Sequence, residues 1–505
     1  MKKETLLLLG FVGIKFILQY FLVHPVYELH RDEFLHLDQA HHLAWGYHSV
    51  PPFTSWISWL IWQSGNGHFW IKFFPALFGA LTIVIVWKTI ERLKGGVYAC
   101  ILAATALLCS VLLRINILYQ PNSFDILAWT FLYFCLIRFI QTGQSKWLYM
   151  LAVGFALGFL NKYNIIFCAA GLLPALLCSA HRQIFTRPQL YIAILLALIL
   201  ISPNLIWQFQ HDFPVLNHMK ELRETQLTHV SRGNFLKEQI FFFIGSVFIP
   251  LAAFISFLVY PAFRTYRWLF FSYMFTIVIF MALKAKPYYA IGLYPILFAF
   301  GSVYLSRIWE KGRAYSLRYI AMAIILLFCY PLIVIAMPVF SPATYAEKAA
   351  QKRPFSEHTW EDGKKHPISQ DFADMLGWKE LAQRIDSIYQ TLDNQEAVLI
   401  LCDNYGQAGA INYYTRIKGL SAGSFTNDYI NWLDLDRNIQ TIIRVKDAKN
   451  DDLSREKLLF NRIDLAGKIE NEYAREKGTW LFVLSDPKVA VAERLKAVRI
   501  QLQQH

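Results

Sequence analysis

Long runs of apolar residues constrain this chain more than any other feature of its sequence. A helix that crosses a membrane needs about 20 predominantly apolar residues. The first run, Thr5–Val23, follows Lys2 and Lys3, and no small-residue cleavage pattern comes after it, so it predicts an uncleaved span. Further runs lie at about 69–90, 96–113, 124–141, 147–160, 164–180, 189–208, 239–260, 268–283, 288–306 and 318–337. The sequence therefore predicts a mainly α-helical, polytopic membrane bundle of about eleven spans.

The composition supports this prediction against the alternative of several soluble domains. Hydrophobic residues make up 55% of the 505 residues, and charged residues only 17%, against about 25% in typical soluble domains. The same figures exclude intrinsic disorder, collagen and coiled coil. The net charge is +13, but there is no basic stripe or aromatic–basic motif, so nucleic acid is not an expected partner.

The charges of the loops predict the orientation of the chain. Lys and Arg are more numerous in the short loops on the side of the N-terminus, which indicates that this side is cytoplasmic. An odd number of spans then places residues 338–505 outside the plasma (inner) membrane. The long loops, residues 24–68 and 209–238, also lie outside, together with most acidic residues. We therefore expect a transmembrane domain over residues 1–337 whose chemistry faces outward.

Residues 338–505 have the pattern of a small, separate α/β domain. Short strands are predicted at Ala397–Cys402, Thr441–Val445 and Thr479–Leu484, with helical periodicity at 376–390 and 488–503. The first strand runs through Asp403-Asn-Tyr-Gly406 into a helix that is expected to end near Thr415. Alternating strands and helices favour a small α/β layer.

The first outer loop carries the most informative polar residues. Asp32 and Glu33 stand side by side after the first span. Local physics alone allows that they only favour the start of a surface helix, where acids interact well with the helix dipole. The loop also holds His24, His30, His36, His41, His42 and His48. A divalent metal is one interpretation of these histidines, but no tight ligand motif is present, so ordinary histidines at the membrane interface are the favoured interpretation.

A second acid and several cations lie on the same predicted side of the membrane. Asp125 precedes an apolar run, where it could again be a simple helix-start acid, or could line one cavity together with Asp32. Four cations contradict the preference for the cytoplasmic side: Arg114, Lys162, Lys284 and Lys286. A ligand phosphate would account for them, because Lys and Arg bind phosphate oxygens strongly. The alternative is that these long side chains reach lipid headgroups.

These segments, in this order, resemble the polyprenyl-phosphate-sugar-dependent glycosyltransferases related to protein O-mannosyltransferases and lipid A aminoarabinose transferase. The motifs that carry the resemblance are Arg31-Asp-Glu33, His42-Leu-Ala-Trp-Gly-Tyr47, Pro51-Pro52, Phe124-Asp125, Gly158-Phe-Leu-Asn-Lys-Tyr163 and Lys286-Pro-Tyr-Tyr-Ala-Ile-Gly-Leu-Tyr-Pro295. In the tail, Ala373–Trp378 and Asp403–Gly406 resemble the extracytoplasmic tail of bacterial members.

The resemblance implies an enzyme that moves a sugar from a polyprenyl-phosphate donor to a glycan, lipid or protein acceptor outside the membrane, with inversion at the anomeric carbon. It implies that Asp32 is the catalytic base, with Glu33 and Asp125 as acceptor orienters or metal ligands. The donor would contact a set of basic and aromatic residues: Arg114, Lys162, Tyr163, Lys286, Tyr288 and Tyr289. The resemblance implies no required cofactor, but a divalent cation is a candidate because some relatives use one.

Two other classes of protein share part of this pattern. A transporter or flippase of lipid-linked sugars would also have many spans, but it favours ionisable residues at mid-span, broken helices and repeated halves. A non-catalytic assembly factor for the cell envelope is the second alternative. The acids at the outer ends of the spans favour the enzyme.

Overall fold

The structure is a computed structural model that describes residues 3–225, 231–351, 358–448 and 452–503. The chain forms two compact units. The first consists of residues 1–22 and 44–339, and the second of residues 23–43 and 340–505. Residues 23–43, the start of the loop that is predicted to lie outside, thus fold with the tail of the chain. The expected division into one domain over residues 1–337 and another over residues 338–505 stays a prediction.

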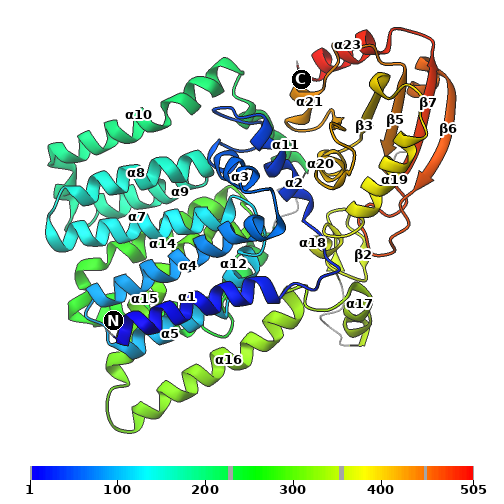
Figure 1. Ribbon diagram of the computed structural model, residues 1–505. Helices are drawn as coiled ribbons and strands as arrows, with labels where there is room; N and C mark the ends of the chain where they lie inside the picture. Colours follow the sequence, from blue (N-terminus) through cyan, green and yellow to red (C-terminus); the bar gives the residue numbers. More distant parts are fainter. Residues whose placement is uncertain (1–2, 226–230, 352–357, 449–451, 504–505) are drawn as a thin grey trace. The chain divides into compact units, whose positions relative to one another are not determined.

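The first unit consists of helices, which Figure 1 shows lying side by side. In chain order they are α1 (Lys3–Phe21), α3 (Phe53–Gln63), α4 (His68–Arg92), α5 (Val97–Leu108), α6 (Val111–Ile115), α7 (Asn122–Thr142), α8 (Lys146–Asn161), α9 (Ile165–Leu177), η2 (Arg182–Thr186), α10 (Pro188–Gln210), α11 (Pro214–Thr225), α12 (Arg232–Phe241), α13 (Phe248–Val259), η4 (Pro261–Tyr266), α14 (Trp268–Ala282), η5 (Pro287–Leu293), α15 (Tyr294–Ile308), η6 (Gly312–Ser316) and α16 (Leu317–Ala336). The expectation of a mainly helical chain is confirmed.

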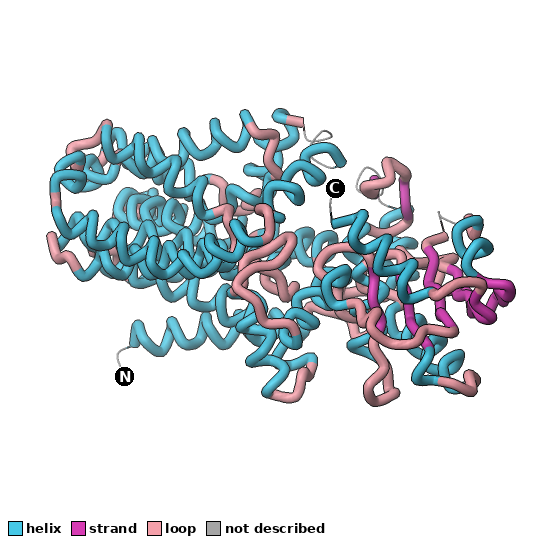
Figure 2. Tube along the Cα trace, turned by 90° about the horizontal axis from the view of Figure 1, so that it is seen from above, coloured by secondary structure: helices cyan, strands magenta, loops and turns pink. Residues whose placement is uncertain are grey.

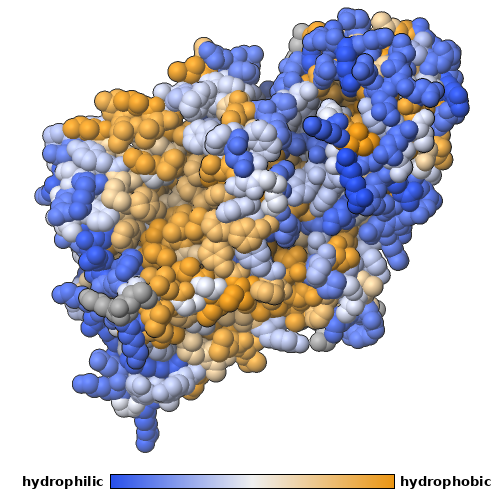
Figure 3. All heavy atoms as spheres, in the orientation of Figure 1, coloured by the Kyte–Doolittle hydropathy of each residue, from blue (hydrophilic) through white to orange (hydrophobic). Residues whose placement is uncertain are grey.

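The apolar helices occupy the predicted ranges. Among the described residues, six helical segments are long and apolar enough to cross a membrane, and five shorter apolar helices accompany them. Helix α4 packs against α1 and α7, α8 against α7 and α10, and α15 against α5 and α13. Figure 3 shows hydrophobic residues gathered over this unit's helices, as expected for a surface in contact with lipid. The number of spans remains a prediction.

Two predicted spans are interrupted in the structure. The range 96–113 is divided into α5 and α6, and the range 239–260 into α12 and α13. Between α12 and α13, Gly245 lies so close to α16 that an added Cβ would be 2.7 Å from Phe328. Lys15 and Gln19 of α1 donate to the carbonyl groups of Leu112 and Leu113 in α6 over 3.3 and 3.2 Å. The lysine inside the first apolar run therefore has a hydrogen-bond acceptor on a neighbouring helix.

The second unit contains all the described strands, drawn in magenta in Figure 2. Its elements are α2 (Arg31–Asp38), η1 (Gln39–His41), α17 (Pro342–Gln351), β1 (His358–Thr359), β2 (Lys365–His366), α18 (Gln370–Ala373), α19 (Trp378–Gln390), η7 (Gln395–Ala397), β3 (Val398–Cys402), α20 (Tyr405–Tyr414), β4 (Ala422–Ser424), α21 (Tyr429–Trp432), β5 (Thr441–Lys446), α22 (Ser454–Leu459), β6 (Phe460–Lys468), β7 (Trp480–Pro487) and α23 (Val491–Gln503). The five-stranded sheet has the order β4-β3-β5-β7-β6. Strands β4, β3 and β5 are parallel, and β7 and β6 are antiparallel to their neighbours.

The parallel part of the sheet is covered by helices because β3 is apolar on both faces. Leu399 and Leu401 pack with Val491 and Leu495 of α23. The alternate residues of β3 point to the other face, and α20 packs against β3 and β4. Helix α2 packs on α20 in turn, and Gly409 of α20 has no room for a Cβ, which would lie 2.6 Å from the Cβ of Phe34. The start of the outer loop is thereby fixed to this sheet.

Candidate functional site

The predicted site residues are divided between the two units, and each group is described by itself. Asp32 and Glu33 belong to the second unit. The first unit holds the predicted donor contacts and the second acid: Arg114, Asp125, Lys162, Tyr163, Lys286, Tyr288 and Tyr289.

Helix α2 begins with a capping box that fixes the backbone at Asp32. The Nδ1 atom of His30 accepts the backbone N–H of Asp32 over 3.2 Å, and the backbone N–H of His30 donates to Oε2 of Glu33 over 2.7 Å. Such reciprocal bonds satisfy amide groups at the start of a helix that otherwise have no partner. Glu33 is fully buried. The geometry therefore gives Glu33 a contact that orients the Asp32 turn.

Asp32 is the acid of this turn that faces outward. Its side chain is 40% exposed, and the hydroxyl group of Tyr405 donates to its Oδ1 over 2.7 Å. Burial raises the pKa of Asp32, but nearby positive charge, that of Arg31 included, and the bond from Tyr405 outweigh burial and hold the pKa below its ordinary value. The carboxylate is therefore ionised at neutral pH and accessible to a substrate.

Arg31 ties this turn to the first residues of α20. Its guanidinium group lies over the ring of Tyr405, 4.4 Å from the ring centre. A Cβ at position 406 would be 2.5 Å from Cγ of Arg31, so only glycine fits there. The backbone N–H of Arg31 donates to the carbonyl group of Asp374 over 3.0 Å. These contacts position the Tyr405 hydroxyl at Asp32.

Further acids gather where the parallel strands β3 and β5 end. The Nε2 atom of Gln407 donates to Asp447 over 2.5 Å and to Glu476 over 2.6 Å. Asn404 caps α20 and also donates to Asp447 over 3.1 Å. Burial, followed by the charges of Glu476 and Asp403, raises the pKa of Asp447 to about 6. Crevices at the carboxyl ends of parallel strands commonly hold the polar residues of a site, and here they support Arg31 and Tyr405.

Asp38, at the other end of α2, gives a testable dependence of stability on pH. Burial raises its pKa from 3.8 to about 6, although Tyr429 and Asn412 donate hydrogen bonds to it. A raised pKa means that the ionised form destabilises the fold, so stability increases as the pH falls through 6. The shift corresponds to at most about 3 kcal/mol. Both hydrogen bonds end on Oδ2, and the carbonyl oxygen of an asparagine can accept both without carrying a buried charge.

We therefore expect Asp38→Asn to raise the Tm of the purified protein at neutral pH and to reduce the gain in Tm that the wild type shows on acidification. Thermal unfolding followed by circular dichroism over a pH series measures both effects. The matched control is Asp393→Asn, which changes an exposed aspartate of the same unit. If the Tm changed with pH in the same way in Asp38→Asn and in the wild type, the prediction that the ionised Asp38 side chain destabilises the fold would be wrong.

In the first unit, Asp125 is buried and held by two side chains. Trp129 donates to Oδ1 over 3.0 Å and Asn164 to Oδ2 over 2.8 Å. Asn164 also donates to the carbonyl group of Tyr289 over 3.1 Å. A Cβ at Gly292 would lie 2.7 Å from Trp129, so this glycine allows the close approach of η5. Asp125 thus links α7, α9 and η5.

Lys162 follows the end of α8 and lies beside this acid. Its Nζ donates to Oδ1 of Asn122 over 2.7 Å and lies 4.3 and 5.3 Å from the ring centres of Tyr289 and Tyr288. Asp125 attracts the ammonium group electrostatically and Lys286 repels it. The structure therefore brings together five of the predicted residues: Asp125, Lys162, Lys286, Tyr288 and Tyr289.

Tyr163 and Arg114 lie in other surroundings. The hydroxyl group of Tyr163 donates to Asn204 and accepts from Gln208, each over 3.0 Å, and Asn204 donates to the carbonyl group of Trp45 over 2.6 Å. Tyr163 thus connects α10 to the outer segment that follows residue 43. Arg114 is half-buried on α6.

His218 on α11 is a basic residue that the sequence analysis did not single out. Its ring lies 5.6 Å from that of His48. Burial, followed by the charges of His48 and Lys286, lowers the pKa of His218 to about 4. Lys286 therefore has basic neighbours, Lys162 and His218, on two segments that are far apart in the sequence, and that separation kept His218 from being predicted.

Tyr405 is the other functional residue that sequence reasoning missed. Its motif was recognised, but its contact with Asp32 joins residues 373 positions apart.

The described parts of the chain contain no group of three or more His, Cys, Asp or Glu side chains placed to hold a metal ion.

Comparisons with known proteins agree with the resemblance seen in the sequence. Residues 49–207 match the family model described as dolichyl-phosphate-mannose-protein mannosyltransferase. A curated relative, the lipid A galacturonosyltransferase RgtD of Rhizobium johnstonii, is 24% identical over 197 residues. That match covers 37% of this chain and 41% of the length of the relative.

Solved structures of ArnT from Cupriavidus metallidurans have the same fold over nearly the whole chain. The structure with bound undecaprenyl phosphate aligns with a TM-score of 0.63 at 13% identity and covers 96% of this chain and 98% of ArnT. The apo structure gives a TM-score of 0.65 at 14% identity and covers 97% and 99%. The predicted resemblance is thereby confirmed: residues 49–207 carry the sequence pattern of the dolichyl-phosphate-mannose-protein mannosyltransferase family, in a chain with the fold of ArnT.

Proposed function

We propose that this protein is an integral-membrane glycosyltransferase that moves a sugar from a polyprenyl-phosphate donor to an extracytoplasmic acceptor. The observation that carries the proposal is the partly exposed, ionised carboxylate of Asp32, held by Tyr405 at the start of the first outer loop. The match of residues 49–207 to the mannosyltransferase family supports it. The named relative acts on lipid A, so a glycolipid is one acceptor class, beside glycans and proteins.

Asp32 is assigned as the general base. As the acceptor oxygen bonds to the anomeric carbon, its proton passes to the Asp32 carboxylate. The bond from that carbon to the phosphate oxygen breaks, and the phosphate leaves with the electron pair. One displacement inverts the anomeric centre. The negative charge near the sugar also favours the oxocarbenium-like transition state.

The basic residues of the first unit are assigned to bind the phosphate of the donor. Lys162 and Lys286 would stabilise the negative charge that develops on the departing phosphate, with Arg114 as a further cation. Tyr288 and Tyr289 orient Lys162, and Tyr163 holds the neighbouring outer segment. Asp125 fixes Asn164 and balances Lys162. That Asp32 and Asp125 line one cavity stays a prediction, as does the orientation with a cytoplasmic N-terminus and an extracytoplasmic tail.

The test is a transfer assay with the purified full-length protein. Defined polyprenyl-phosphate sugars are incubated with glycolipid, glycan and peptide acceptors, and the products are analysed by mass spectrometry. Donor-dependent transfer with release of polyprenyl phosphate is the expected result. Movement of intact donor across a vesicle membrane without transfer would instead support a flippase. Adding EDTA to the same assay tests the requirement for a divalent cation.

Tyr405→Phe should change the pH dependence of this reaction. The hydroxyl group stabilises the ionised form of Asp32, and a hydrogen bond to a charged group contributes about 1.5–3 kcal/mol. Its removal raises the pKa of Asp32, so the acid limb of the kcat/KM profile should move to higher pH by about one to two units.

The control for this prediction is Tyr389→Phe, which removes another hydroxyl of the same unit, one that donates to the carbonyl group of Gln395. Its acid limb should stay in place. A folded Tyr405→Phe protein with an unmoved acid limb would show that Tyr405 does not set the charge of the base.

A further inference from the structure

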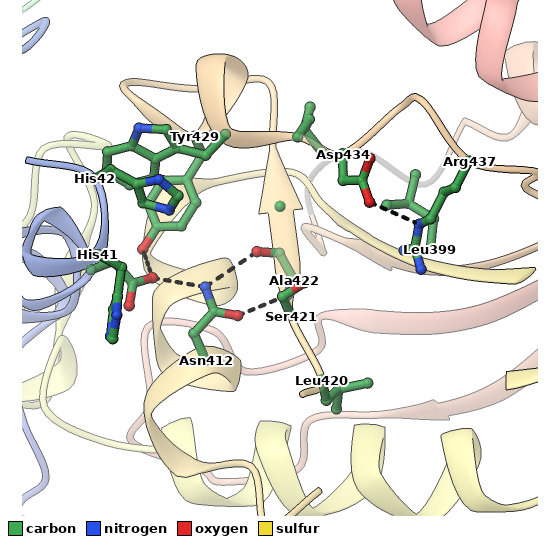
Figure 4. Close-up of a pocket in the computed structure, with 14 residues that line it drawn as sticks. His41, His42, Leu399, Asn412, Leu420, Ser421, Ala422, Tyr429, Asp434 and Arg437 are labelled. Atoms are coloured by element: carbon green, nitrogen blue, oxygen red, sulfur yellow. Dashed lines mark hydrogen bonds and ion pairs between the residues drawn. The ribbon is translucent and has the colours of Figure 1, made fainter. Parts of the chain in front are cut away.

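A cavity of about 310 Å³ lies in the second unit, beside the segment that carries Asp32. Figure 4 shows His42 and Tyr429 on one side of it, Asp434 and Arg437 on the other, and Asn412 between them. Its volume is at the lower end of the range for ligand pockets. The cavity is therefore large enough for a small ring rather than for an extended chain.

One wall of this cavity is aromatic. The rings of His42 and Trp432 are stacked, with their centres 4.3 Å apart and an angle of 9° between their planes. The ring of Tyr429 lies 5.0 Å from that of Trp432, at an angle of 62°. Aromatic faces carry negative charge density and attract the weakly positive C–H groups on the face of a sugar ring.

A site for a sugar ring also needs groups that recognise its hydroxyls. Asp38 and its hydrogen-bond partners provide them. Tyr429 and Asn412 donate to Oδ2 of Asp38 over 2.6 and 2.7 Å. Asn412 is itself fixed by accepting the backbone N–H of Ala422 over 2.7 Å. The carboxylate of Asp38 is thus held rigidly, with Oδ1 left to accept a ligand hydroxyl.

The charges of the rim favour a neutral ligand. Asp434 and Arg437 form a pair of opposite charges 3.8 Å apart, and Asp38 adds a further acid. A phosphate would be repelled by two carboxylates, whereas a hydroxyl group both donates and accepts. A few polar groups that fix orientation, set against an aromatic wall, are the usual arrangement in a small-molecule pocket.

We propose that this cavity binds one sugar ring of the acceptor, at a distance from the hydroxyl that reacts. The inference rests on the proposed glycosyl transfer, and it narrows the acceptor to a glycan or glycolipid. Asp32 and Asp38 lie on the same helix, α2, separated by about 9 Å along its axis. The helix that carries the base therefore also carries one wall of the acceptor subsite.

The test measures binding without chemistry. Saturation-transfer NMR is recorded on the detergent-solubilised full-length protein with a panel of free disaccharides that contain neutral hexoses, amino sugars or uronic acids. We expect saturation transfer from the wild-type protein to at least one of these disaccharides. Trp432→Ala should reduce this signal about fivefold, the equivalent of losing one aromatic contact, whereas Trp432→Phe should keep most of it.

The matched control is Trp360→Ala, because Trp360 is also stacked on a histidine of the same unit, His366, with ring centres 3.5 Å apart. Its signal should equal that of the wild type. The proposal is overturned if no disaccharide binds to the wild type, if inorganic phosphate displaces the sugar, or if Trp432→Ala binds as well as Trp360→Ala. Asp32→Asn should bind the disaccharide normally. If the protein bound a disaccharide but transferred no sugar from the donor, the transferase proposal would be wrong, whereas the proposal of a sugar site would stand.

Discussion

Replacing Asp32 with asparagine should reduce the rate of sugar transfer about a thousandfold, the usual contribution of a general base. Asparagine has nearly the shape of aspartate but cannot accept the proton of the acceptor hydroxyl. The capping box at His30 and Glu33 does not use the Asp32 side chain, so the helix should form as in the wild type. Single-turnover assays with labelled donor measure the effect.

The control for this variant is Asp393→Asn, which removes an exposed carboxylate of the same unit and should transfer at the wild-type rate. Thermal unfolding of both variants checks that each is folded. Near-normal turnover by folded Asp32→Asn would remove Asp32 from the mechanism.

Replacing Lys162 with glutamine should reduce kcat/KM for the donor about a hundredfold, as expected when one group that stabilises developing charge is lost. Lys162 already lies against Tyr289 and Asn122, so its ammonium group is positioned before a donor arrives. Part of the loss should appear as weaker binding of labelled polyprenyl phosphate. Asp32→Asn should bind that ligand nearly as well as the wild type.

Lys146→Gln is the matched control, because Lys146 begins α8, whereas Lys162 follows the end of the same helix, and Lys146 is exposed. It should leave both transfer and binding unchanged. Two results would contradict separate roles for Asp32 as the base and Lys162 as the phosphate-binding cation. One is that Lys162→Gln binds labelled polyprenyl phosphate as well as the wild type, and the other is that Asp32→Asn loses as much of this binding as Lys162→Gln.

The sequence predicted what depends on local pattern. Apolar runs of membrane-spanning length became helices because the bilayer leaves the backbone no other partner, and the buried strand at 398–402 was recognised by its continuous apolar run. Strand β6 was missed because its side chains are largely exposed and polar. Strand β4 was missed because it has only three small residues, Ala422–Ser424.

The candidate site was predicted residue by residue, but not as a set of contacts. Motif and position identified Asp32 and Lys162. The partners that fix them come from distant segments: Tyr405 for Asp32, and Asn122, 40 positions earlier, for Lys162. No local pattern encodes such pairs. For the same reason, a lysine inside the first span could be noticed in the sequence, but its acceptor, the carbonyl group of Leu112, could not be identified.

The grouping of residues 23–43 with residues 340–505 has a consequence for protein engineering and for biosynthesis. The turn that carries Asp32 is made early by the ribosome, but the unit that it belongs to is complete only when the last third of the chain has emerged. A chimaera that exchanges the tail for that of a relative must therefore exchange residues 23–43 with it. A protein truncated after the last helix of the first unit would retain its apolar helices and lose the elements that hold the turn at Asp32.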